Sequence, residues 1–134
     1  MSGVSPIDGL IVLPTRHAPA DILARTVAIA KSRGITVFAQ IDFSGDAARS
    51  NLTLKPTCLV ILGNPVAGTP VMAATPTVAI DLPLKILAFE DADGHMWVAY
   101  NDPKYLRRRH GFAEELVRNL APIGALAEAV AAAD

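Results

Sequence analysis

The sequence is poor in the residues that build several common kinds of site. It holds a single cysteine, Cys58, which excludes an intrachain disulfide and a metal site made of several cysteines. Charged residues make up 19% of the chain and the net charge is −1, so no overall field attracts nucleic acid or anionic lipid. The three histidines, His17, His95 and His110, show no close metal-ligand spacing. We therefore expect no metal and no cofactor, and nucleic acid is an unfavoured partner.

Long hydrophobic runs are also missing. No apolar stretch reaches the length that a bilayer-spanning helix needs. The N-terminal stretch lacks a basic start, and its apolar segment, residues 10–13, is too short for a signal peptide. These observations predict no membrane partner and a cytoplasmic location.

Hydrophobic residues are abundant, at 51% of 134 residues, which is enough chain for one domain with one core. A compact monomer needs a largely polar surface, so this proportion implies elements buried on both faces or a surface covered by another subunit. We interpret residues 1–134 as a single domain, and we expect a homodimer.

Apolar and alternating runs between turn formers predict strands. The expected strands are residues 9–15, 35–42, 57–62, 84–90 and 95–101. In the second of these, alternation predicts that Val37, Ala39 and Ile41 share one face. Helical spacing or cap signals predict helices from Pro19, over 44–50, 103–110 and 114–133, with a break at Pro122. The order indicates a two-layer α+β fold with a mixed sheet of about five strands.

Turn and cap residues punctuate these elements. Gly34 follows a basic last turn and is expected to end the first helix in a left-handed conformation. Residues 91–94 predict a hairpin turn with a positive φ at Gly94. Asp102 before Pro103 predicts a helix N-cap.

The segment ILGNPVAGTP, residues 61–70, has the glycine spacing of a nucleotide-binding loop. That loop requires a lysine and a hydroxyl residue after its second glycine, where this sequence has Thr69 and Pro70. The sequence therefore disfavours nucleotide hydrolysis. We expect instead a turn at residues 64–65, a left-handed Gly68, and a helix that Thr69 caps and Pro70 begins. Free N–H groups at that helix start could hold a small anion.

Four segments together resemble the domain-of-unknown-function family 302. They are FAQID (38–42), GNPVAGTPVM (63–72), DLPLKILAFED (81–91) and DGHMWVAYNDPKYLRRRHG (93–111). The resemblance covers residues 10–112 and leaves 113–134 as a C-terminal helical extension. It implies a small bacterial or archaeal α/β domain similar to proteins that assemble as dimers, and it supplies no reaction or ligand. Relatives usually have a histidine where this chain has Phe43, and Gln40 nearby cannot replace an imidazole as acid or base.

Polar residues near strand ends are the remaining candidates for a site. Glu90 is the last residue of an apolar strand, close to Phe89 and Trp97, and perturbed acids favour functional sites. The competing interpretations are structural: acids that cap helices or shape turns, an Arg107–His110 run that suits a helix C-terminus, and a buried, inert Cys58. We predict a homodimeric module that binds a small ligand or a partner protein. Its predicted ligand-binding residues are Asp42, Asn64, Gly68, Thr69, Glu90, Tyr100 and Asn101. The alternative is a small enzyme with a carboxylate site around Glu90, Asp42 and Asn101.

Overall fold

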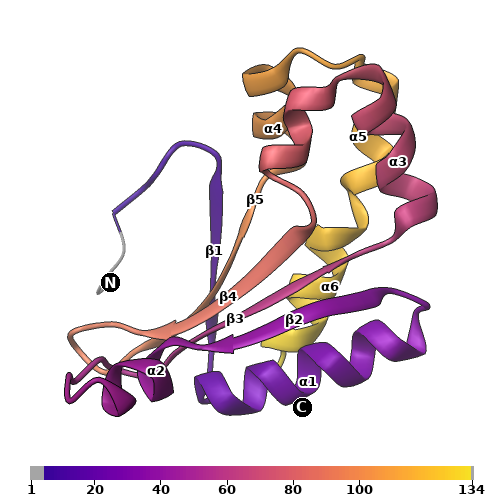
Figure 1. Cartoon of the computed structure of the whole chain (residues 1–134). Coiled ribbons are helices and arrows are strands. Elements are labelled where there is room, and N and C mark those ends of the chain that lie inside the picture. Colours follow the sequence, from indigo (N-terminus) through magenta and orange to yellow (C-terminus); the bar gives the residue numbers. More distant parts are fainter. Residues whose placement is uncertain (1–4, 134) are drawn as a thin grey trace.

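The computed structural model describes residues 5–133, so residues 1–4 of the stretch searched for a signal peptide lie outside it. Its strands are β1 (Leu10–Thr15), β2 (Thr36–Asp42), β3 (Thr57–Gly63), β4 (Leu84–Glu90) and β5 (Met96–Asn101). They form one sheet in the order β1-β5-β4-β3-β2 (Figure 1). The predicted α+β class and strand number are confirmed.

The prediction of a mixed sheet is wrong, because all four strand pairings in the described part of the chain are antiparallel. Strands β1 and β2 do run in the same direction. They lie at opposite edges of the sheet, however, since helix α1 (Pro19–Ser32) carries the chain from one edge to the other. A strand–helix–strand order therefore occurs here without parallel pairing.

Two helices cover one face of the sheet. Helix α1 and helix α6 (Pro122–Ala131) pack against each other and against the strands (Figure 1). The main core between them consists of Ile22, Val60, Leu62, Ile86, Ala88, Val98, Ile123, Leu126, Ala127, Val130 and Ala131. The C-terminal helix is thus part of the same core as the sheet.

The other helices flank two ends of the sheet. Helix α2 (Phe43–Arg49) follows β2 directly. A helical lobe at the opposite end comprises α3 (Pro65–Ala74), η1 (Pro76–Ile80), α4 (Pro103–His110), η2 (Glu114–Leu116) and α5 (Val117–Leu120) (Figure 1). This lobe has its own small core of Val71, Val78, Leu106, Phe112 and Leu120. The predicted break at Pro122 is confirmed, because α5 ends at Leu120 and α6 begins at that proline.

Several predicted caps and turns are confirmed. The Asp102 carboxylate accepts a hydrogen bond of 2.9 Å from the Lys104 N–H. Gly34 and Gly94 have φ values of +69° and +84°. The caps and the hairpin are local features, which explains why short sequence signals were enough to predict them.

The predicted helix start at Pro70 is wrong. Helix α3 begins at Pro65, and the Asn64 side chain caps it by accepting a hydrogen bond of 3.0 Å from the Val66 N–H. Gly68 lies inside the helix and is not among the residues with positive φ. Asn64-Pro65 is itself a cap followed by a first-turn proline, a signal equal to the one at Thr69-Pro70. The earlier signal prevails, and the helix accommodates Pro70 by giving up one backbone hydrogen bond.

The predicted alternation in β2 is also wrong, because the register shifts between Val37 and Ala39. Val37 pairs with Leu62 and packs against the main core, whereas Ile41 pairs with Leu59 on the opposite face. An extra residue in a strand reverses the facing of everything after it. Ile41 is consequently turned away from α1 and α6.

The sheet face turned away from α1 and α6 carries a continuous apolar row. Directly paired residues share a face, so one side chain from each strand lines up across the whole sheet. The row consists of Val12, Ala99, Leu87, Leu59 and Ile41. We call this surface the open face, because the described helices that pack on the sheet core lie on its other side (Figure 1).

Candidate functional site

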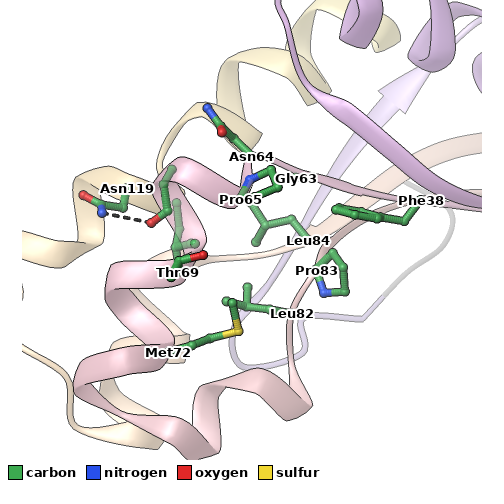
Figure 2. A pocket seen from close by; sticks show the side chains of 13 residues that line it. Phe38, Gly63, Asn64, Pro65, Thr69, Met72, Leu82, Pro83, Leu84 and Asn119 are labelled. Atoms are coloured by element: carbon green, nitrogen blue, oxygen red, sulfur yellow. Dashed lines mark hydrogen bonds between the residues drawn. The ribbon is translucent and has the colours of Figure 1, made fainter.

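A pocket of about 170 Å³ lies between α3, the end of β3 and the segment that precedes β4. Its lining is mainly apolar, from Phe38, Pro65, Met72, Leu82, Pro83, Leu84 and Leu120. Figure 2 shows Met72 and Leu82 side by side, with Leu84, Pro83 and Phe38 continuing the apolar wall. Asn64, Thr69 and Asn119 supply the polar side chains. This composition, apolar with a few polar groups, is typical of small-molecule sites.

Local sequence explains how the pocket forms. The Asn64 cap turns the chain into α3 directly after β3, so the helix leans over the strand end. Asn119 on α5 donates a hydrogen bond of 3.0 Å from Nδ2 to the Ala67 carbonyl oxygen and holds the two helices together (Figure 2). The helix cap at Asn64 and the hydrogen bond from Asn119 therefore hold the walls of the pocket in place.

Three of the predicted ligand-binding residues, Asn64, Gly68 and Thr69, line this pocket together. The start of α3 offers little to an anion, however. The N–H groups of Val66, Ala67 and Gly68 donate to Asn64 at 3.0, 2.9 and 2.8 Å, and Pro65 has none. With the first-turn donors already bonded, the pocket suits an apolar ligand better than a charged one.

Asp42 and Glu90 lie away from the pocket, near the opposite end of the sheet. Asp42 caps α2, and hydrogen bonds from the Gly45 N–H and the Ser44 hydroxyl hold its pKa below the usual value. Glu90 forms an ion pair of 3.0 Å with Lys55. Both carboxylates thus have structural partners.

The other two predicted residues are on β5. Glu90 pairs with Met96 at the start of that strand, whereas Asn101 is its last residue, so Glu90 and Asn101 lie at opposite ends. Tyr100 packs against the main core, and burial raises its pKa. The structure does not bring Asp42, Glu90 and Asn101 into one group, which removes the geometric basis for the carboxylate enzyme.

A cluster that sequence reasoning missed joins α4 to η1. His110 donates from Nε2 to the Asp81 carboxylate at 2.6 Å, and its Nδ1 lies 2.9 Å from the Thr77 hydroxyl. Arg109 binds both Asp81 oxygens at 3.0 Å. Asp81 and the Arg109-His110 pair belong to two of the segments that carry the family resemblance, but nothing in the sequence shows that these segments meet. We call these four residues the Asp81 cluster.

Asp91, Asp93 and His95 bring potential metal-ligand atoms within 4.8 Å of one another at the β4–β5 turn. Asp91 is already occupied: it accepts hydrogen bonds from the backbone N–H groups of Asp93 and His95, and from Trp97 Nε1 at 2.9 Å. The Trp97 bond is the main reason why the pKa of Asp91 lies below its usual value. This group is explained as a turn that anchors Trp97.

Cys58 is buried in β3, as predicted, and burial raises the pKa of its thiol. A thiol that stays protonated is a poor nucleophile, so the structure gives Cys58 a packing role.

The family model for the "Domain of unknown function DUF302" matches residues 11–131. The chain belongs to this family. The structure of an uncharacterized conserved DUF302 protein from Bacillus stearothermophilus superimposes with a TM-score of 0.75 over 93% of this chain and 97% of that one, at 17% identity. The two chains therefore share a fold.

The curated relatives of this DUF302 chain are named as ion channels. Proteins named fluoride-specific ion channel FluC 1 from Brucella suis and Brucella abortus are 42% identical to it over 102 residues, or 76% of this chain. The match spans only 40% and 38% of their own lengths. Among residues 5–133, no helix is both long and apolar enough to cross a membrane.

Proposed function

We propose that this DUF302 domain binds a small, largely apolar ligand and acts as a homodimer. The observation that carries the proposal is the pocket beneath α3, whose apolar walls end in Asn64, Thr69 and Asn119. Apolar walls supply affinity by removing ligand surface from water, while a few polar groups fix orientation. The absence of charge from the pocket lining favours a neutral molecule.

Filling the pocket tests this proposal. A Cβ added at Gly68 meets only the tip of Met72, at 3.9 Å, and needs no unusual backbone conformation. Gly68→Phe should therefore fold and place its ring in the cavity that Gly68 lines. Ala73→Phe, on the same helix but outside the lining, is the matched control. Probed with 1-hexanol, toluene and indole by NMR chemical-shift titration, the wild type and control should bind, and Gly68→Phe should bind at least ~10-fold more weakly. If the wild type, Ala73→Phe and Gly68→Phe bind the probes with equal affinity, the proposed pocket is refuted.

The open face supports the homodimer. Its central row is apolar on every strand: Val12, Leu87, Leu59 and Ile41 are partly exposed, and the small Ala99 between them is buried. Phe38, which is 51% exposed, extends the apolar surface at one side. Soluble monomers rarely leave a contiguous patch of this kind uncovered, and sheets pack face to face in many proteins. Because Phe38 also lines the pocket, a second copy on the open face would stand beside the ligand.

A charge at the centre of the open face should separate the copies. Leu87→Lys places an ammonium group in the middle strand of the row, where pairing two copies would bury it without a partner. Sedimentation at about 10–100 μM should show a dimer for the wild type and a monomer for Leu87→Lys. Val66→Lys, at an exposed apolar position on α3, should remain dimeric. A monomeric wild type would overturn the dimer while leaving the pocket proposal intact.

A second candidate function rests on the Brucella relatives. Their names suggest that a domain like this one works beside a fluoride channel, and this chain matches only part of each relative. We therefore test whether this chain binds the remaining part of such a relative. The part of the Brucella suis protein outside the match should copurify with this tagged chain after coexpression, and should do so less with Leu87→Lys if the open face is the contact. No copurification with either form would exclude the partnership.

A further inference from the structure

A second hollow of about 220 Å³ lies on the other side of the β3–α3 connection. It is bordered by the end of α1, the end of β3 and the start of α6. Its accessible apolar surface comes from Ile35, Leu84, Pro122 and Ala125, because the core residues Leu62, Ile123 and Leu126 beneath it are buried. It shares with the first pocket Gly63, Asn64, Ala67, Leu84 and Asn119. The two hollows are therefore neighbours, separated by one short segment of chain and the Asn119–Ala67 hydrogen bond.

Arg33 is the only ionisable side chain among the residues that line this second hollow. Its backbone ends α1, and its N–H donates to the Ile29 and Ala30 carbonyl oxygens. No hydrogen bond or ion pair joins its guanidinium group to residues 5–133. By contrast, Arg25 on the same helix is bonded to carbonyl oxygens of α6, at Ala129 and Val130.

The surroundings of Arg33 define what could bind there. A guanidinium group pairs with carboxylate or phosphate oxygens through two parallel hydrogen bonds. The apolar walls beside it favour a hydrocarbon body, and a ligand seated on them would shield the exposed guanidinium group from water and so strengthen its charge-assisted bonds. A neutral ligand would form no ion pair with the guanidinium group. An anion without an apolar body would not cover the apolar walls.

We infer that the second hollow binds a small amphiphile: a carboxylate or phosphate monoester held by Arg33, with an apolar chain against Ile35, Pro122 and Ala125. This deepens the proposed ligand-binding function and rests on it. The hollow and the first pocket together fall near the lower end of the ~300–1,000 Å³ typical of ligand sites. A longer chain would extend toward the shared residues Leu84 and Asn119, whereas a short one would stay beside Arg33.

Matched probes with one chain length test the inference. Hexanoate, hexyl phosphate and 1-hexanol present a carboxylate, a phosphate and a neutral head on the same hydrocarbon. By NMR titration at low salt, we expect at least one of the anions to bind about 10-fold or more tightly than 1-hexanol at the second hollow. Arg33→Gln should abolish that preference. Arg16→Gln, an exposed arginine outside both pockets, should retain it.

The outcomes separate this inference from the proposed function. If 1-hexanol binds the wild type as tightly as both anions, or if Arg33→Gln keeps the anion preference, the inference is overturned while ligand binding stands. In that case the positive charge of Arg33 only stabilises the C-terminal end of α1. If none of the three probes binds the second hollow, the inference fails, and the proposed function fails with it only if toluene and indole also do not bind the first pocket. A preference for hexanoate over hexyl phosphate, or the reverse, identifies the head group.

Discussion

Asp81→Ala is expected to lower the free energy of unfolding by about 3 kcal/mol, since it leaves the buried His110 donor without an acceptor and removes the ion pair with Arg109. Asp81 accepts hydrogen bonds from His110 at 2.6 Å and from Arg109 at 3.0 Å. The His110 side chain is only 6% exposed, so water cannot replace the lost acceptor there. Arg109 is 50% exposed and can turn to solvent, which keeps the estimate at the lower end for such pairs.

Urea unfolding of three variants checks this prediction. Asp8→Ala removes an ion pair with Arg108 in which both side chains are largely exposed, and should change stability by less than ~0.5 kcal/mol. Asp81→Asn keeps an acceptor for His110 but loses the charge, so its cost should fall between the other two. Equal, small losses in all three variants would show that the Asp81 cluster does not hold η1 to α4.

Local features of this fold were predictable from the sequence. The hairpin at residues 91–94, the Asp102 cap and the break at Pro122 each depend on residues within one turn of chain. Where two equal local signals competed, as at Asn64-Pro65 and Thr69-Pro70, sequence alone could not choose between them. The register shift in β2 had no sequence signal either, because it depends on how that strand pairs with β3.

The candidate site was predictable only in part. Asn64, Gly68 and Thr69 are close in sequence, and the structure places them in one pocket. The apolar wall opposite them comes from Phe38, Leu82 and Leu120, three distant positions whose meeting depends on the strand order. The Asp81 cluster is a similar case, because 28 positions separate Asp81 from Arg109. Long-range contacts of this kind follow from topology, which a single sequence specifies weakly.

Gly9→Ala is expected to destabilise the protein by about 3 kcal/mol, from strain and overlap together. Gly9 precedes β1 with a φ of +79°, a conformation that costs alanine about 1–2 kcal/mol. An added Cβ would also overlap the ring of Tyr105 on α4, and the ring cannot withdraw freely because it packs against the core of the helical lobe. The Gly9 carbonyl oxygen accepts a hydrogen bond of 2.8 Å from the Asp102 N–H, which ties this backbone to the start of α4.

Gly34→Ala isolates the strain from the overlap. Gly34 has a similar φ of +69°, but nothing lies within 4 Å of a Cβ added there. Its cost should therefore be about 1 kcal/mol, the backbone contribution alone. Thermal and urea unfolding of both variants should show Gly9→Ala as clearly the less stable, and Gly9→Ala combined with Tyr105→Ala should recover part of the steric cost. If the two glycine variants unfold alike, close packing of Tyr105 on the Gly9 backbone does not stabilise the contact between β1 and the helical lobe.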